Sequence, residues 1–165
     1  MLRFFSTFFC LLLSTAVFSN IVQIEDGEEI LQYSDYKVLT TPIDLSIQEI
    51  MNEGYGSKFI PCTKKTPRLE NTSKWTWLKF TLQSKREEQR IIDFFDNKID
   101  YIKLFIPKGN GFTIYEAGDQ LPFNSRFFHN KNIAFPITLK KEQAITCYAK
   151  IESKDHINLI IALRS

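Results

Sequence analysis

The chain has 165 residues, of which 21 are basic and 19 are acidic, so its formal net charge is only +2. This near balance is not that of a protein that binds nucleic acid, and no nucleic-acid partner is expected. Without its first 19 residues the chain would have 165 − 19 = 146, enough for one sizeable core but short for two. We therefore predict a single domain over residues 20–165.

The first 19 residues have the parts of a secretory signal peptide. Arg3 supplies the positive start, Phe4–Phe18 is largely apolar, and Val17 and Ser19 are small residues at the right spacing before a cleavage point. This apolar run is shorter than the roughly 20 residues that a membrane-spanning helix needs. We predict a signal peptide over 1–19 and an exported protein, periplasmic or at the cell surface. An uncleaved membrane anchor is the alternative.

Two cysteines remain after the signal peptide, Cys62 and Cys147. Export makes a disulfide between them chemically possible. Cys147 falls in the apolar phase of its predicted strand, which is typical of a small buried side chain, and the sequence leaves the bridge open. His129 and His156 stand alone, without metal-ligand spacing, so neither a metal site nor another cofactor is expected.

One short helix is predicted near the N-terminus of the domain. Ser46 and Glu49 have the spacing of a capping box, in which the two side chains and two backbone N–H groups satisfy each other. An apolar stripe follows, and two glycines are expected to end the helix: Ile47, Ile50 and Met51, then Gly54 and Gly56. About two turns are too short to be stable unless they dock on a sheet.

After a loop over 54–74, apolar and polar residues alternate with period two in one run after another, as in half-buried strands. Seven or more short strands at regular spacing indicate an antiparallel sandwich or barrel. Lys108–Gly111 reads as a tight hairpin connection that needs positive φ. The predicted strands are Trp75–Gln83, Gln89–Phe95, Tyr101–Pro107, Phe112–Ala117, Ile133–Leu139, Ala144–Glu152 and Ile157–Leu163.

The order of these segments resembles a known family, the periplasmic sensor domain, type 2, of bacterial seven-transmembrane receptors with diverse intracellular signalling modules. The resemblance covers about residues 30–163, and the order of its loose motifs is what makes it informative. The matching residues are Trp77, Lys79 and Phe80 on an aromatic strand, Asp100, Leu104 and Phe105 on the strand pair, and Gly118, Asp119, Pro122, Phe123 and Arg126 in the segment G-D-Q-L-P-F-N-S-R.

The resemblance implies an all-β, antiparallel, jelly-roll-like β-sandwich that opens with an edge strand and a short capped helix. It also implies recognition of a small extracytoplasmic ligand by the sensor module of a signalling receptor. The membrane-embedded portion and the signalling modules of such a receptor are missing from this chain. The chain is therefore either a sensor domain cut from a longer receptor or a free-standing exported relative, and both remain open.

Candidate ligand-binding residues lie on the first long strand. Alternation places Leu78, Phe80 and Leu82 on one face and Trp75, Trp77, Lys79 and Thr81 on the other. Large aromatic rings beside a cation and a hydroxyl can stack on a sugar ring and hydrogen-bond its hydroxyls. The competing interpretation is that Trp77 packs beneath the N-terminal helix or the loop over 54–74, as most tryptophans pack.

A second set of candidates lies in the loop Gly118–Arg126. Asp119 can cap or turn the backbone, and Arg126 carries a guanidinium suited to a carboxylate, a phosphate or vicinal hydroxyls. Loops held by a rigid sandwich are where binding residues concentrate. The alternative is structural: Arg126 pairs with Asp100 or Asp119 and locks the loop.

No sequence motif of a known catalytic site is present, so an enzyme is not expected. The function predicted is non-catalytic sensing of a small extracytoplasmic ligand, with a carbohydrate as the favoured class. The alternative is a secreted β-sandwich domain that binds a protein partner or serves adhesion through a sheet edge or exposed aromatic residues.

Overall fold

The computed structural model describes residues 21–25, 29–30, 35–62, 68–69, 74–96 and 98–165. The predicted signal peptide, residues 1–19, lies outside these described residues. Within the described part of the chain, no helix is both long enough and apolar enough to cross a membrane.

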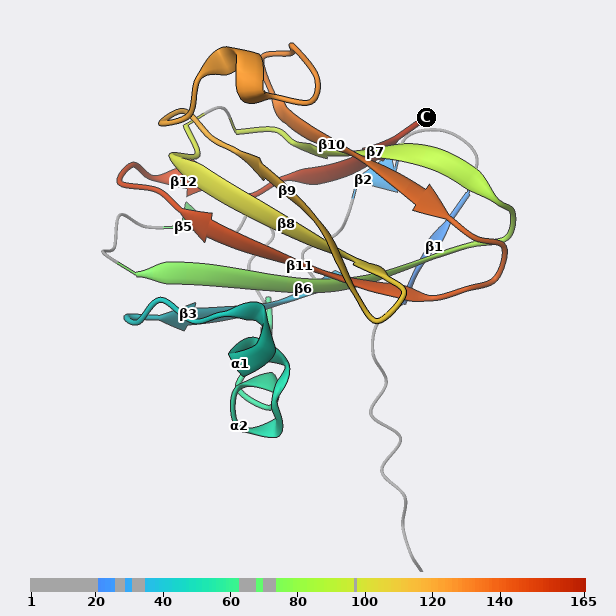
Figure 1. The fold of residues 1–165 in the computed structure, drawn as a ribbon, viewed down its shortest axis with the longest axis horizontal. Helices are drawn as coiled ribbons and strands as arrows, with labels where there is room; N and C mark the ends of the chain where they lie inside the picture. The colour runs from blue at the N-terminus through green and yellow to red at the C-terminus, as the bar shows by residue number, and fades with distance from the viewer. Residues whose placement is uncertain (1–20, 26–28, 31–34, 63–67, 70–73, 97) are drawn as a thin grey trace, which may run out of the picture.

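Two β-sheets packed face to face make up most of the described structure (Figure 1). The larger sheet has the order β4 (Ile60–Pro61), β3 (Tyr36–Thr41), β6 (Trp75–Ser84), β11 (Ile145–Glu152), β8 (Tyr101–Lys108) and β9 (Gly111–Ala117), and β1 (Ile21–Ile24) also pairs with β6. The smaller sheet has the order β10 (Ile133–Leu139), β7 (Glu88–Phe94), β13 (Ile161–Arg164) and β2 (Glu29–Ile30). A further pair joins β12 (Ile157–Asn158) to β5 (Arg68–Leu69).

The predicted all-β antiparallel sandwich is confirmed; among the described strands, β1 pairs with β6 in parallel. The main core lies between the two sheets, because the period-two alternation turns one face of each sheet inward. The inward side chains that are fully or almost fully buried include Leu78, Phe80 and Leu82 of β6, Leu104 of β8, Ile92 and Phe94 of β7, Phe135 of β10 and Leu163 of β13. Jelly-roll connectivity stays a prediction.

A second apolar layer covers the outer face of the larger sheet. Helix α1 (Ile47–Met51) and helix α2 (Glu53–Gly56) lie on the side of this sheet that faces away from β10, β7 and β13 (Figure 1). Ile50 is fully buried against the sheet, and Trp77 beneath the helices is also fully buried, with its ring stacked on Phe105 at a centroid distance of 5.5 Å. The larger sheet is therefore buried on both faces at this point.

The capping box at the start of the helix is confirmed. The backbone N–H of Glu49 donates to Ser46 Oγ at 3.3 Å, and the backbone N–H of Ser46 donates to Glu49 Oε2 at 2.8 Å. The predicted end of the helix is wrong. Asn52 has extended backbone angles and its side chain accepts from the N–H of Tyr55, so it ends α1 and caps a second turn that contains both glycines. Residues 47–56 therefore form two short helices rather than one.

The predicted strands agree with the observed ones to within one residue at most ends, because the alternation is regular over 75–152. Gly109 has a φ of +58°, as the predicted hairpin requires. The last predicted strand, 157–163, is divided into β12 and β13. Leu159 between them is buried, and Ile160 is exposed and donates its N–H to the carbonyl of Asn158.

Neither Cys62 nor Cys147 forms a disulfide, so the bridge that the sequence left open is absent. Cys147 lies in the main core with none of its surface exposed, and burial raises the pKa of its thiol to about 12. Cys62 is half-buried at the margin of the same core.

We expect the two thiols to differ in reactivity. At pH 8, a pKa of about 12 leaves only about one Cys147 thiol in 10⁴ ionised, and burial also blocks access. In a Cys10→Ser variant, a maleimide reagent should therefore modify native protein at Cys62 and modify Cys147 only after unfolding in urea. Mass spectrometry of the labelled peptides measures this. Equal labelling of Cys147 in native protein would contradict the buried position.

Candidate functional site

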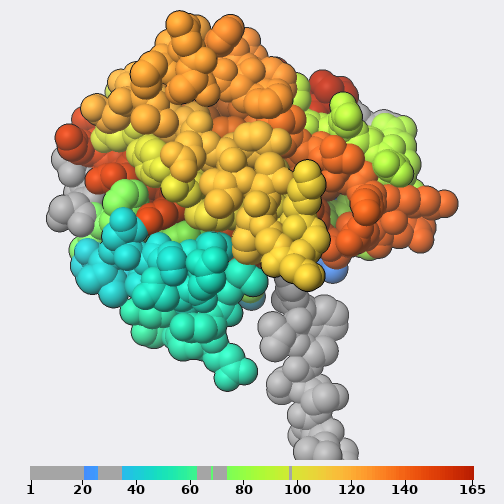
Figure 2. Space-filling view, viewed as in Figure 1, coloured from blue at the N-terminus to red at the C-terminus, as the bar shows by residue number. Residues whose placement is uncertain are grey.

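A hollow of about 450 Å³ lies on the outer face of the larger sheet, beside the helices. We call it the outer hollow. In Figure 2 it lies between the cyan helical segment and the yellow strand β8, where atoms of β6 and β11 show through. It is lined by Asp44, Trp75, Asp100, Tyr101, Lys103, Gln120, Lys150, Glu152 and Lys154.

The aromatic part of the outer hollow consists of Trp75 and Tyr101. Their rings meet edge to face, with centroids 6.5 Å apart. Lys150 Nζ lies 4.3 Å from the centroid of the Trp75 ring, forms an ion pair with Asp44 and donates to the carbonyl of Leu45 at 3.3 Å. A cation over the face of an indole ring is an attractive contact. Lys150 therefore ties the segment before α1 to the sheet and to Trp75.

Asp100 organises the far side of the outer hollow. Its carboxylate accepts from the backbone N–H of Lys154 at 2.5 Å and from Nε2 of Gln120 at 3.3 Å. The backbone carbonyl of Asp100 also accepts from the N–H of Gln120 at 3.1 Å. Gly118 makes this approach possible: its φ is +154°, and an added Cβ would lie 2.1 Å from the Asp100 carbonyl oxygen. The backbone at Asp100 and the backbone of the segment that begins at Gly118 are thus in direct contact.

Lys103 and Glu116 form an ion pair on neighbouring strands, with Nζ 2.6 Å from Oε1. The hydrogen bond from Lys103 lowers the pKa of the Glu116 carboxyl, and the same bond raises the pKa of Lys103. Burial is the main cause that raises the pKa of the Tyr101 hydroxyl, which stays protonated at neutral pH. Lys103 is therefore held over one end of the outer hollow.

The charges that line the outer hollow balance. Three are negative (Asp44, Asp100 and Glu152) and three are positive (Lys103, Lys150 and Lys154). The side chains of Glu152 and Lys154 make no hydrogen bond or ion pair with another described residue, so an acceptor and a donor remain available. An aromatic wall with balanced donors and acceptors suits a polar, uncharged ligand better than a strongly charged one.

The three predicted residues of β6 have different surroundings. Trp75 lines the outer hollow and is half-buried. Trp77 has no exposed surface, as the packing interpretation expected, and its Nε1 has no hydrogen-bond partner. Lys79 lies two residues after Trp77 on β6 and away from the outer hollow. Its Nζ is 5.7 Å from the centroid of the Tyr148 ring and 6.0 Å from that of the Phe59 ring. Of these three, only Trp75 presents surface to a ligand there.

Neither of the two predicted loop residues lines the outer hollow. Asp119 is exposed, and its backbone N–H donates to the carbonyl of Ile99 at 2.8 Å, next to Gln120. The structural alternative expected Arg126 to pair with Asp100 or Asp119, and it pairs with neither. Its Nη1 donates to the carbonyls of Asn130 and Lys131, both at 3.1 Å, and its guanidinium carbon lies 5.1 Å from the Phe123 ring centroid. Arg126 therefore stabilises the loop through contacts within the loop.

Sequence reasoning missed most of the lining. Tyr101 and Lys103 alternate on β8 just as Lys150 and Glu152 alternate on β11, so the outward phase of both strands was readable from the sequence. Their position beside Trp75 was not readable, because it depends on the strand order β6-β11-β8. Asp44 joins them only because the helix packs back on the sheet.

Comparison with known proteins gave one family match. The family model described as 7TMR-DISM extracellular 2 matches residues 40–165, which is 126 of the 165 residues. No curated protein matches the chain. Within the described residues, no group of three or more His, Cys, Asp or Glu side chains is placed to hold a metal ion.

Replacing Gly118 by alanine should destabilise the protein by about 2 kcal/mol or more, because the methyl group would overlap the Asp100 carbonyl and the φ of +154° is unfavourable for an L residue. Urea unfolding measures the change. Gly111→Ala is the matched control, since no atom lies within 4 Å of its added Cβ, and it should change stability by less than about 0.5 kcal/mol. Equal effects of the two substitutions would contradict the close approach at Gly118.

The Lys103–Glu116 pair should make a pH-dependent contribution to stability. The lowered Glu116 pKa stabilises the fold above its ordinary value of 4.5, and this is lost as pH falls through the folded pKa. The raised Lys103 pKa stabilises the fold below its ordinary value of 10.5, and this is lost as pH rises through the folded pKa. Glu116→Gln should therefore lower the free energy of unfolding most between about pH 5 and pH 10, and should not change it in strong acid.

Because both side chains are partly exposed, the cost of Glu116→Gln should stay below about 1 kcal/mol. Urea unfolding across pH measures it. Glu142→Gln is the control, since Glu142 is exposed and makes no ion pair with a described residue. A cost for Glu116→Gln that does not vary with pH would show that the ion pair is not its source.

Proposed function

Since the chain belongs to the 7TMR-DISM extracellular 2 family, an extracellular sensor domain of 7TMR-DISM receptors, we propose that it senses a small carbohydrate in the outer hollow without chemically changing it. The family places the domain in an extracytoplasmic, receptor context. The proposed part is the ligand, its site and the absence of catalysis. Cleavage of residues 1–19 and a single sensor domain over 20–165 belong to the same proposal.

The observation that carries the proposal is the combination of an aromatic wall with balanced charge in one hollow. Trp75 and Tyr101 supply the apolar faces on which a sugar ring stacks. Glu152 and Lys154 supply an acceptor and a donor for its hydroxyls. A hollow of about 450 Å³ is within the usual range for small-molecule sites.

The other predicted residues have supporting roles in this proposal. Trp77 packs below the site, and Lys79 packs on Tyr148 further along β6, so both keep β6 in place. Asp119 and Arg126 hold the loop that carries Gln120 to the edge of the outer hollow. A bound sugar would touch the segment before α1, the sheet and this loop together, and would favour the arrangement in which all three are close.

Binding of a partner protein is the alternative function, and one observation favours it. Ile114, Phe123 and Phe127 are each at least half exposed. Large apolar side chains left exposed on a surface can mark an interaction site. This alternative predicts association that depends on concentration and is insensitive to Trp75.

The proposal is tested by thermal unfolding of the purified protein against neutral sugars, sugar acids, amino acids and organic acids. A ligand at about 100 times its dissociation constant adds about 2.7 kcal/mol and raises the midpoint by several degrees. We expect a shift with neutral sugars that Trp75→Ala abolishes. Ile114→Ala removes an exposed apolar side chain outside the outer hollow and should leave the shift unchanged.

A fluorescent reporter locates the binding site directly. The chain has two tryptophans, and Trp77 makes no hydrogen bond that a phenylalanine would lose. Trp77→Phe therefore leaves Trp75 as the single reporter, and its emission should change when the sugar binds. A midpoint shift without a change in Trp75 emission would move the site elsewhere, and no shift with any neutral sugar would overturn the proposed ligand class.

A further inference from the structure

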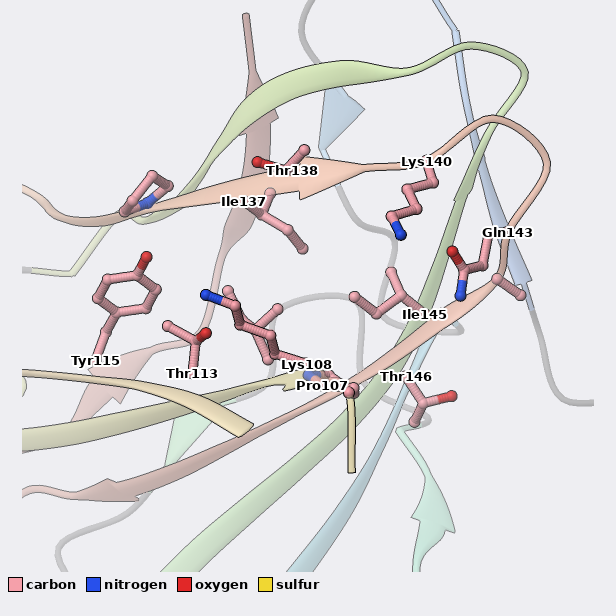
Figure 3. A pocket seen from close by; sticks show the side chains of 14 residues that line it. Pro107, Lys108, Thr113, Tyr115, Ile137, Thr138, Lys140, Gln143, Ile145 and Thr146 are labelled. Atoms are coloured by element: carbon pink, nitrogen blue, oxygen red, sulfur yellow. The ribbon is translucent and has the colours of Figure 1, made fainter. Parts of the chain in front are cut away.

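A second and larger cavity, of about 690 Å³, opens between the two sheets (Figure 3). It lies where β9, the edge strand of the larger sheet, faces β10, the edge strand of the smaller one. The start of β11 and the turn before it form its remaining side. We call this cavity the intersheet cleft. It shares no lining residue with the outer hollow.

The floor of the intersheet cleft is apolar. Ile106 and Ile137 belong to the main core and expose only 7% and 3% of their surface, and Ile145 packs against the same core. Tyr115 closes one end, where its ring stacks on Phe135 of the opposite sheet at a centroid distance of 5.8 Å. An apolar group that entered the cleft would therefore meet the side chains of the core itself.

The rim of the intersheet cleft is cationic. Lys108 and Lys140 both extend toward the space between the strands (Figure 3). Neither forms an ion pair with a described residue, and the described residues that line the cleft include no Asp or Glu. Two uncompensated positive charges at the mouth of an apolar space attract an anion. This pattern is opposite to the balanced charge of the outer hollow.

Further donors and acceptors between floor and rim are unused within the fold. The side chains of Thr113, Tyr115, Thr138 and Gln143 line the cleft, and none makes a hydrogen bond to another described residue. Such groups can orient the polar end of a bound molecule. Apolar floor, free hydroxyls and cationic rim follow one another from the core outward.

We propose that the intersheet cleft binds an amphiphilic carboxylate, with its apolar chain on Ile106, Ile137 and Ile145 and its carboxylate between Lys108 and Lys140. Burial of the chain supplies the attraction, and the two ammonium groups supply charge-assisted hydrogen bonds to the carboxylate. The volume of the cleft is within the range of about 300–1,000 Å³ that small-molecule sites occupy. This site is independent of the carbohydrate proposed for the outer hollow.

The test uses octanoate as the probe. Acetate, which has the carboxylate without the long chain, and 1-octanol, which has the chain without the carboxylate, are the controls. Isothermal titration measures affinity for the purified protein, and isoleucine methyl NMR locates the ligand. We expect octanoate to bind, to shift the methyl signals of Ile106, Ile137 and Ile145, and to leave Trp75 emission unchanged in the Trp77→Phe variant. Acetate should not bind. The affinity for 1-octanol should be at least about tenfold lower than that for octanoate.

Two variants separate the cleft from general binding. Lys108→Ala/Lys140→Ala should weaken octanoate binding by about tenfold or more. Lys131→Ala/Lys141→Ala is the matched control, because it removes the same charge from exposed lysines that do not line the cleft, and it should leave the affinity unchanged. Thr113→Phe, which fills the cleft from β9, should abolish binding while the thermal midpoint shows that the protein is folded.

Several results would overturn the proposal. They are no binding of octanoate at millimolar concentration, equal affinity for octanoate and 1-octanol, or equal weakening by the two double-lysine variants. Methyl shifts confined to other isoleucines would do the same. None of these results bears on sugar binding at Trp75, so the two proposals fail separately.

Discussion

Strand β6 is buried on both of its faces, and the rest of the structure depends on this constraint. Leu78, Phe80 and Leu82 face the smaller sheet, whereas Trp77 faces the opposite side and is equally buried. A strand with apolar side chains on both sides needs a covering layer on each. The smaller sheet is one layer and helix α1 with Phe59 is the other. Their stacking gives the molecule three layers at this point.

The outer hollow exists because the second layer is short. Helices α1 and α2 have only five and four residues, so they cover Trp77 and leave Trp75, two residues earlier on the same face, at their margin. Lys150 bridges this margin through its contacts with Trp75 and Asp44. The loop anchored on Asp100 closes the far side. A site at the junction of three separately anchored segments is suited to a sensor, since a ligand can alter how those segments lie relative to each other.

Much of the fold was predictable from local patterns. The period-two alternation over 75–152 predicted the strands, and the spacing of Ser46 and Glu49 predicted the start of α1, because each pattern reflects a contact within a few residues. The end of α1 was not predicted, since Asn52 proved to cap a second turn rather than continue the first. Alternation also placed Trp75 and Trp77 on one face correctly. It could not show that a helix covers only one of them.

The candidate site was less predictable, because it is made of contacts between distant segments. Tyr101 and Lys150 lie beside Trp75 only through strand order. The structural alternative paired Arg126 with Asp100 or Asp119, but its Nη1 donates instead to backbone carbonyls four and five residues further along the chain. A local partner costs less chain entropy than a distant one. The glycine of the G-D segment, in contrast, had the structural role that its residue type suggests, the close approach of two backbones at Asp100.

Both sheets end on the side of the intersheet cleft, which raises the question of why they do not add further strands. In the smaller sheet the outermost strand, β10, contains Pro136 in register with Ile91 of β7. Proline has no N–H, and a sheet tolerates it at an edge, where the missing donor does not weaken the internal ladder. The same position denies a hydrogen bond to any strand that approaches from outside. Pro136 thereby helps to keep one molecule from extending its sheet into the next, and leaves the mouth of the cleft open to solvent.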